Sequence, residues 1–237
     1  MNWGNRTGRL SPTGLMLVLT WVTGLIEAVS LLALGPVFTA MQTGNVLFLS
    51  FGAARVGDLP ALPSAVSLAA FAAGAVGGAR LESAAQAHGW RWISIGLSAE
   101  TTLILAAAAA GWGLAPRYGD PSAPHLAVTA LLAVAMGLRT VTSMRVNVPG
   151  VPTTLVTRSV TALLGGSVLG QDSALGYGTG AWVRRALAVL AMFAGGLVGA
   201  LLVRADWPVG ALLLPAAAVV LGVALLYRAQ PPAPGRG

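Results

Sequence analysis

Long apolar stretches alternate along the chain with short breaks rich in proline, glycine and polar residues, and this pattern predicts membrane-spanning helices. A helix needs about 20 apolar residues to cross a bilayer. Two of the eight apolar stretches, 36–54 and 153–169, are weakened by polar residues. The other six approach or exceed the required length and lie at 13–34, 62–79, 93–114, 126–144, 186–203 and 209–226.

The two weakened stretches leave two topologies open. If both cross the membrane, the chain has eight spans, and if both are broken or re-entrant, it has six. Six spans place nine arginines on one side and three on the other, whereas eight spans place eight against four. Because positive loops stay in the cytoplasm, we expect an all-α transmembrane bundle with six full spans, two broken segments and both termini cytoplasmic.

The two halves of the chain repeat one another. Residues 68–77 match residues 190–199 at seven of ten positions, which indicates an internal duplication of the kind common among transporters. Small residues four apart, at Gly74/Gly78 and Gly195/Gly199, predict close helix packing, either within the chain or in a homodimer. The expected organisation is a tail 1–12, a first membrane repeat 13–114, a loop 115–125, a second membrane repeat 126–228 and a disordered tail 229–237.

Composition places the chain in the bilayer and excludes several functions. Hydrophobic residues make up 56% and charged residues 9%, where a soluble domain has about 25% charged residues. The arginines behind the net charge of +7 are scattered, so no nucleic acid partner is expected. The chain has no cysteine, and His88 and His125 lack metal-ligand spacing. We therefore expect no metal, no cofactor and no enzymatic activity.

Four charged residues interrupt apolar segments, and each costs about 2.5–3.5 kcal/mol at a helix centre. Glu27 and Arg139 fall at nearly equivalent places in the two halves, which favours a pair between them. Glu27 has the alternative of a substrate or proton role. For Glu100 we expect structural charge pairing, and Arg158 has the alternatives of pairing with Glu100, balancing an anionic ligand or extending to an interface. The remaining acids lie near predicted loops, where solvated caps or charge balance are expected: Asp58, Glu82, Asp120, Asp172 and Asp206.

The polar run 42–45 is the strongest local signal. Gly44 allows a helix break, and Thr43 or Asn45 is placed to cap the helix that follows. A half-helix that begins at the membrane midplane offers unpaired N–H groups and suits an anion. The alternative is a short interfacial turn. At the corresponding point of the second half, Thr157 and its neighbours offer hydroxyls and a cation.

Four motifs resemble the YoaK family of bacterial membrane proteins, also described as domain of unknown function 1275. They are residues 24–30 (GLIEAVS), 37–45 (VFTAMQTGN), the pair Phe71 and Gly74, and 135–138 (AMGL). The resemblance covers roughly residues 13–226 and implies a bacterial inner-membrane protein with about six spans. The chain departs from the family at Glu27, at Arg139 with Thr140, and at Arg158, where aspartate, Gln-Asn and glycine are usual.

These features predict a small-molecule secondary transporter or permease with a site at the repeat interface. The expected substrate-binding residues are Glu27, Gln42, Thr43, Asn45, Arg139 and Thr157. The alternative is a non-transporting scaffold or accessory subunit, in which Glu27, Glu100, Arg139 and Arg158 are mutually paired. A water-accessible cavity beside an unpaired Glu27 would distinguish the two functions.

Overall fold

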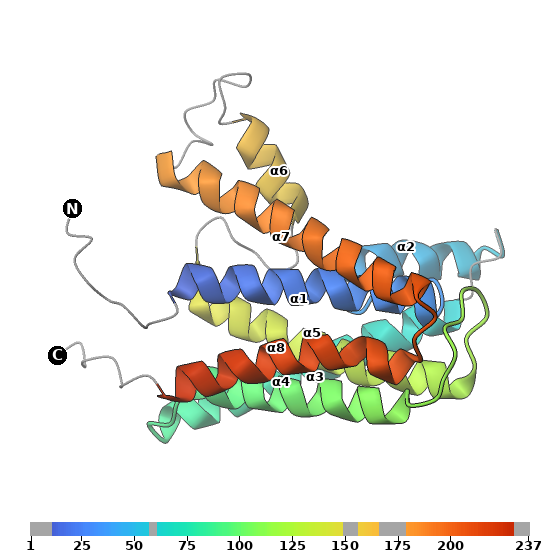
Figure 1. The fold of residues 1–237 in the computed structure, drawn as a ribbon, viewed down its shortest axis with the longest axis horizontal. Helices are drawn as coiled ribbons and strands as arrows, with labels where there is room; N and C mark the ends of the chain where they lie inside the picture. Colours follow the sequence, from blue (N-terminus) through green and yellow to red (C-terminus); the bar gives the residue numbers. More distant parts are fainter. Residues whose placement is uncertain (1–10, 57–60, 149–155, 166–178, 230–237) are drawn as a thin grey trace.

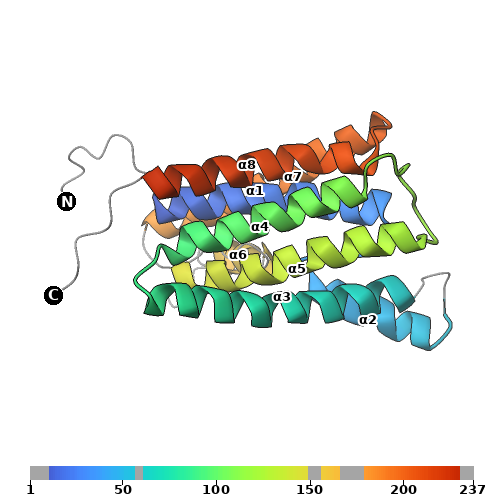
Figure 2. The same ribbon diagram turned by 90° about the horizontal axis from the view of Figure 1, so that it is seen from below.

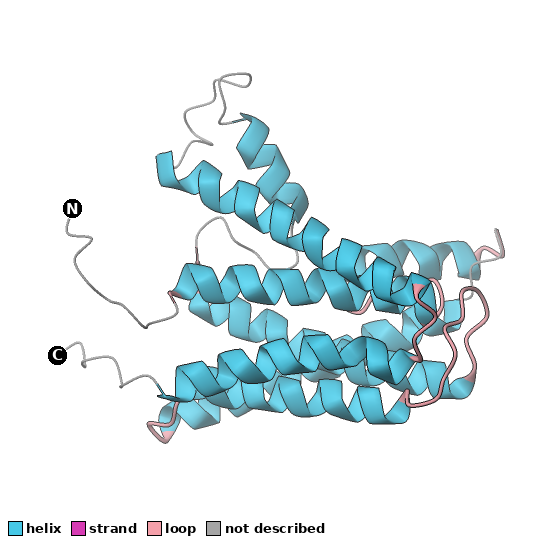
Figure 3. Cartoon of the chain, in the orientation of Figure 1, coloured by secondary structure: helices cyan, strands magenta, loops and turns pink. Residues whose placement is uncertain are grey.

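A computed structural model describes residues 11–56, 61–148, 156–165 and 179–229, and the side chains of 156–159, 165 and 179–181 are outside that description. The described regular structure is entirely helical (Figures 1 and 3). Its helices are α1 (Pro12–Ala33), α2 (Gln42–Ala53), α3 (Ala61–Ala87), α4 (Trp92–Ala110), α5 (Ala123–Val146), α6 (Val156–Gly165), α7 (Thr179–Arg204) and α8 (Val209–Ala229). The predicted all-α class is confirmed.

Six of the described helices are long and apolar enough to cross a membrane: α1, α3, α4, α5, α7 and α8. Helix α2 has 12 residues and α6 has 10, which correspond to about 18 and 15 Å. A hydrocarbon core about 30 Å thick is too wide for α2 or for the described part of α6. The described helix lengths therefore fit the six-span alternative.

The long helices lie side by side and alternate in direction, so α1 begins and α8 ends at the same end of the bundle (Figures 1 and 2). We call this the terminal end. At the opposite end, which we call the re-entrant end, α2 lies beside the start of α3. Helix α6 lies beside the first part of α7, toward the terminal end. The two short helices thus sit near opposite ends.

Glycines bring pairs of long helices into backbone contact. A Cβ atom at Gly74 of α3 would lie 2.1 Å from the carbonyl oxygen of Val134 on α5, and one at Gly195 of α7 would lie 1.9 Å from that of Trp21 on α1. Such approaches need a residue without a side chain. Gly78 and Gly199 pack on the same partners, α5 and α1. These glycines therefore pack against helices of the same chain, which was the first of the two predicted alternatives. A homodimer formed through them would have to displace α5 and α1.

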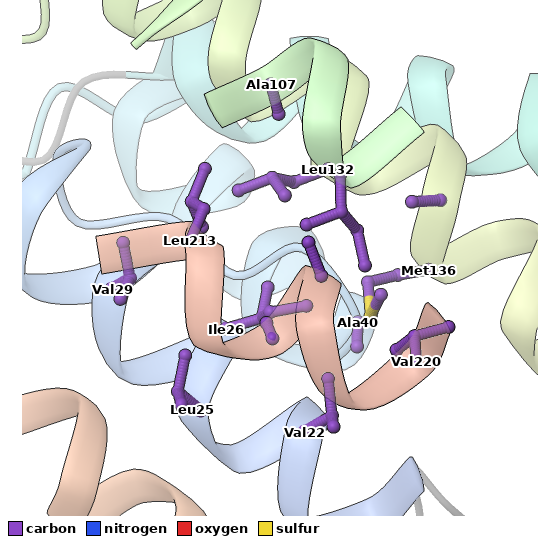
Figure 4. Packing of buried hydrophobic residues seen from close by; sticks show 14 of the residues in the cluster. Val22, Leu25, Ile26, Val29, Ala40, Ala107, Leu132, Met136, Leu213 and Val220 are labelled. Atoms are coloured by element: carbon purple, nitrogen blue, oxygen red, sulfur yellow. The ribbon is translucent and has the colours of Figure 1, made fainter. Parts of the chain in front are cut away.

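The hydrophobic core lies where α1, α4, α5 and α8 meet (Figure 4). Ile26 of α1, Leu132 and Met136 of α5 and Leu213 of α8 are fully buried there. Ala40, from the connection between α1 and α2, belongs to the same cluster and is 5% exposed. A segment without helical structure therefore reaches the interior of the bundle.

Candidate functional site: a re-entrant segment and buried charges

The chain turns back into the bundle after α1. Gly35 adopts a φ of +104°, a left-handed conformation that glycine adopts at little cost, and the hydroxyl of Ser30 donates to the carbonyl of Val37 at 2.5 Å. Residues 39 and 40 then reach Glu27, which lies six residues before the end of α1, or about 9 Å along its axis. Helix α2 starts at this depth, so the predicted re-entrant element is confirmed for residues 34–53.

Glu27 fastens the returning segment to α1. Its Oε1 accepts hydrogen bonds from the backbone N–H of Thr39 at 2.9 Å, the Thr39 hydroxyl at 2.7 Å and the backbone N–H of Ala40 at 2.7 Å. Its Oε2 is buried and has no hydrogen-bond partner. The carboxylate occupies the place at the start of a half-helix where the sequence predicted a bound anion. The protein's own side chain thus takes up these N–H groups.

Asn45 provides hydrogen bonds to the backbone of the returning segment at Phe38. Its Oδ1 accepts from the backbone N–H of Phe38 at 3.0 Å, and its Nδ2 donates to the Phe38 carbonyl at 2.6 Å. The Ser67 hydroxyl on α3 donates to the same carbonyl at 2.6 Å, and Gln42 Nε2 donates to the Thr39 carbonyl at 2.9 Å. Non-helical backbone survives inside a membrane protein only when its polar groups are satisfied in this way.

The predicted helix start needs correction. Helix α2 begins at Gln42 after Met41, which makes no side-chain capping bond. Gly44 and Asn45 therefore lie inside the helix, and neither Thr43 nor Asn45 caps it. Gly44 is required because a Cβ atom there would lie 2.6 Å from the ring of Phe38. Thr43 is exposed and takes no part in the hydrogen bonds that hold the segment.

A second buried cluster joins α1, α4 and α5. Arg139, fully buried on α5, forms an ion pair with Glu100 on α4. Its other terminal nitrogen donates to the carbonyl of Leu19 at 3.1 Å and to the hydroxyl of Thr23 at 3.0 Å, both on α1. The predicted Glu27–Arg139 pair is therefore wrong, because Arg139 reaches α1 one turn before Glu27.

A third cluster was missed by the sequence reasoning. Glu82, expected near a loop, is fully buried inside α3. It accepts a hydrogen bond from the Thr142 hydroxyl on α5, and its Oε2 lies 3.3 Å from Nε of Arg145. The Arg145 guanidinium also lies 4.9 Å from the ring centroid of Trp92. The expected charge balance is present, but it is buried, and no local sequence pattern placed Thr142 beside Glu82.

The chain matches a family described as a protein of unknown function, DUF1275, over residues 15–226. It belongs to this family. No curated protein and no solved structure matches the chain. The residues of this DUF1275 chain that were predicted to bind substrate do not all converge in its fold. The structure brings Glu27, Gln42 and Asn45 together and places Arg139 in a separate cluster. The side chains of Thr157 and Arg158 lie outside the described residues.

One buried acid of this DUF1275 chain has no cation beside it among the described residues. Glu82 is paired with Arg145 and Glu100 with Arg139, whereas Glu27 has no cation within ion-pairing distance among the described residues. A buried charge without a counter-ion costs several kcal/mol. Three hydrogen bonds from the re-entrant segment offset part of this cost. The remaining negative charge suits a proton or a cationic group.

Proposed function

We propose that this chain is a small-molecule secondary transporter, or permease, whose site lies along α1 between Glu27 and the Arg139–Glu100 pair. The observation that carries the proposal is a buried carboxylate, without a cationic partner among the described residues, that is bonded to non-helical chain inside the bundle. Interrupted helices build the sites of many secondary transporters, because they present backbone polar groups at the midplane. A structural bundle alone has no need of such an interruption.

The arrangement of the helices supports an inverted duplication. Helix α1 packs on α7 as α3 packs on α5, and α4 packs on α8. Each half holds three long helices and one short one, so the second half enters the membrane in the opposite orientation to the first. Two inverted halves that rock against each other expose a central site to either side in turn. The Arg139–Glu100–Thr23 cluster lies where the halves meet.

The contacts of Glu27 favour a neutral or cationic substrate over an anionic one. The N–H groups of Thr39 and Ala40, which an anion would need, are already bonded to Glu27. An anion would also meet the uncompensated charge of this carboxylate. The alternative of a scaffold predicts that every intramembrane charge is paired, and the described surroundings of Glu27 argue against it. We propose no enzymatic step and no cofactor.

The location we propose is the bacterial cytoplasmic membrane, with lipid around the bundle and both chain termini in the cytoplasm. The charges of the described residues support this orientation, since positive residues are retained on the cytoplasmic side. Three arginines lie toward the re-entrant end: Arg55 after α2, Arg117 between α4 and α5, and Arg204 at the end of α7. Six lie toward the terminal end: Arg80 and Arg145 in the last parts of α3 and α5, Arg91 between α3 and α4, Arg184 and Arg185 in the first part of α7, and Arg228 near the end of α8.

The test is counterflow in proteoliposomes. A library of neutral and cationic metabolites is first screened by thermal shift on the purified chain, and the stabilising compounds are then assayed as radiolabelled counterflow substrates. We expect counterflow with the wild type and with Ser50→Ala, a control at an exposed position of α2. Glu27→Gln should reduce the rate at least about tenfold, which corresponds to about 1.4 kcal/mol. The proposal fails if no compound gives counterflow, or if Glu27→Gln transports like the wild type.

A further inference from the structure

At residues 39 and 40, a single oxygen of Glu27 holds the re-entrant segment against α1, and nearer the turn the Ser30 hydroxyl bonds the Val37 carbonyl. Three donors, two backbone N–H groups and the Thr39 hydroxyl, converge on Oε1, while Oε2 is buried without a partner among the described residues. Hydrogen bonds to an ionised carboxylate are roughly twice as strong as bonds between neutral groups. The strength with which the segment is held therefore depends on the charge of this one side chain.

Among the described residues, the packing around Glu27 supplies no charge that would keep the carboxylate ionised. Helix α2 contains no charged residue, and Arg139 of α5 contacts α1 one turn away, where Glu100 of α4 already neutralises it. Arg204 of α7 is exposed at the re-entrant end. The remaining charged residues of α3, α7 and α8 lie toward the terminal end: Arg80, Glu82, Arg184, Arg185 and Arg228.

We propose that Glu27 is a proton-operated latch that holds the re-entrant segment closed. A proton from solvent binds Oε2, and the carboxylate becomes a neutral carboxylic acid. The three bonds to Oε1 then lose their charge assistance, and residues 39–40 separate from α1. The inference rests on the proposed function for its purpose, since it makes the proton the coupling ion that opens the transport site. Its test requires no substrate.

The other contacts of the segment determine what moves with it. Asn45 and Gln42 of α2 and Ser67 of α3 are bonded to residues 38 and 39. None of these groups titrates, so these bonds persist when Glu27 takes up a proton. The hydroxyl of Ser30 likewise keeps its bond to the carbonyl of Val37. Residues 38–40 therefore leave α1 together with the start of α2 and remain attached to α3. Gly35, with its positive φ, lies where the moving part joins α1.

The absence of cysteine from the chain makes a direct test possible in lipid vesicles. A single cysteine replaces Ala40, which is 5% exposed, and its rate of modification by a membrane-permeable maleimide is measured over a series of pH values. Ser50→Cys, at an exposed position in the later part of α2, serves as reference at each pH and corrects for the ionisation of the thiol itself. The ratio of the two rates reports how often the segment opens.

We expect the ratio to rise at least about tenfold as the pH falls through the titration of Glu27. Glu27→Gln, which cannot be charged, should keep the ratio high at every pH. Glu27→Asp should restore the pH dependence. Hydrogen exchange of residues 37–45 in the chain without introduced cysteine, corrected for intrinsic rates, should follow the same course and does not depend on Ala40→Cys folding correctly.

A ratio and an exchange rate that do not change with pH would overturn the latch, as would a Glu27→Gln variant that remains closed. Counterflow separates this outcome from failure of the proposed function. Counterflow without a pH-dependent latch removes the proton coupling and leaves the transporter. A pH-dependent latch without counterflow for any compound leaves the latch and removes the transporter.

Discussion

Replacing Gly74 by alanine tests the packing between α3 and α5. The added Cβ atom would lie 2.1 Å from the carbonyl oxygen of Val134 and 2.7 Å from its Cα atom, whereas ordinary van der Waals contact begins near 3.4 Å. The two helices would have to separate by about 1.3 Å, because both clashing atoms belong to backbone and cannot rotate away. Overpacking of this kind costs about 1–3 kcal/mol, occasionally more.

The matched control lies three residues away on the same helix. A Cβ atom at Gly77 would meet no atom within 4 Å, so Gly77→Ala retains only the gain in helix propensity, up to about 1 kcal/mol. Gly74→Ala has the same gain in helix propensity, which offsets part of the loss from overpacking. We expect its free energy of unfolding to fall by about 2 kcal/mol in total. The difference between the two variants is then about 3 kcal/mol.

The assay is reversible unfolding in mixed micelles, followed by circular dichroism as the fraction of denaturing detergent rises. Gly195→Ala on α7, where the Cβ atom would lie 1.9 Å from the Trp21 carbonyl oxygen, should show a loss similar to that of Gly74→Ala. Equal free energies of unfolding for Gly74→Ala and Gly77→Ala would refute the reasoning, because the close approach of α3 and α5 would then have no energetic consequence.

Three further predictions concern the polar contacts and the topology. Asn45→Ala leaves the Phe38 N–H without its acceptor, while the Phe38 carbonyl keeps the bond from Ser67. The free energy of unfolding should fall by about 1–3 kcal/mol, against no measurable loss for Ser50→Ala at an exposed site. Equal unfolding curves for the two variants would contradict the contact. Glu100→Leu and Arg139→Leu should each lower the free energy of unfolding by about 3–5 kcal/mol, because each leaves one buried charge without its partner. The double variant should lose distinctly less than the sum of the two. An additive double-mutant cycle would exclude the pair. With six spans, a single cysteine at Arg80 should be labelled by an impermeant reagent from the cytoplasmic side and one at Arg55 from the outside. The reverse sides are expected with eight spans and would contradict six.

The spans could be predicted from sequence because hydrophobicity and length are properties of single segments. A re-entrant segment was predicted for a related reason: a polar run such as 42–45 has to be satisfied by protein wherever it lies in the membrane. The segment does not reach the predicted midplane, because Glu27 lies only about 9 Å from the end of α1. The start of α2 was not predicted, because Gly44 indicates a break as readily as it indicates a ring packed against it. Only the position of Phe38 in space distinguishes the two explanations.

The pairing of the buried charges could not be predicted because it depends on how each helix is rotated. Glu27 and Arg139 occupy similar places in the two halves, but a side chain contacts whatever its own face of the helix meets. Arg139 faces α4 and the first part of α1, and so it contacts Glu100 and Thr23. Glu82 was assigned to a loop since its stretch loses hydrophobicity after residue 79, although α3 continues to Ala87.

The ion pair between Glu100 and Arg139 has a consequence for biosynthesis. The two residues belong to consecutive spans, α4 and α5, and each would cost about 2.5–3.5 kcal/mol if its helix entered lipid alone. Partitioned together as a helical hairpin, the two spans leave the insertion machinery with their charges already matched. Arg139 then acquires its bonds to the first span in a later assembly step. We therefore expect translation intermediates that stop between these spans to be held at the translocon until α5 emerges.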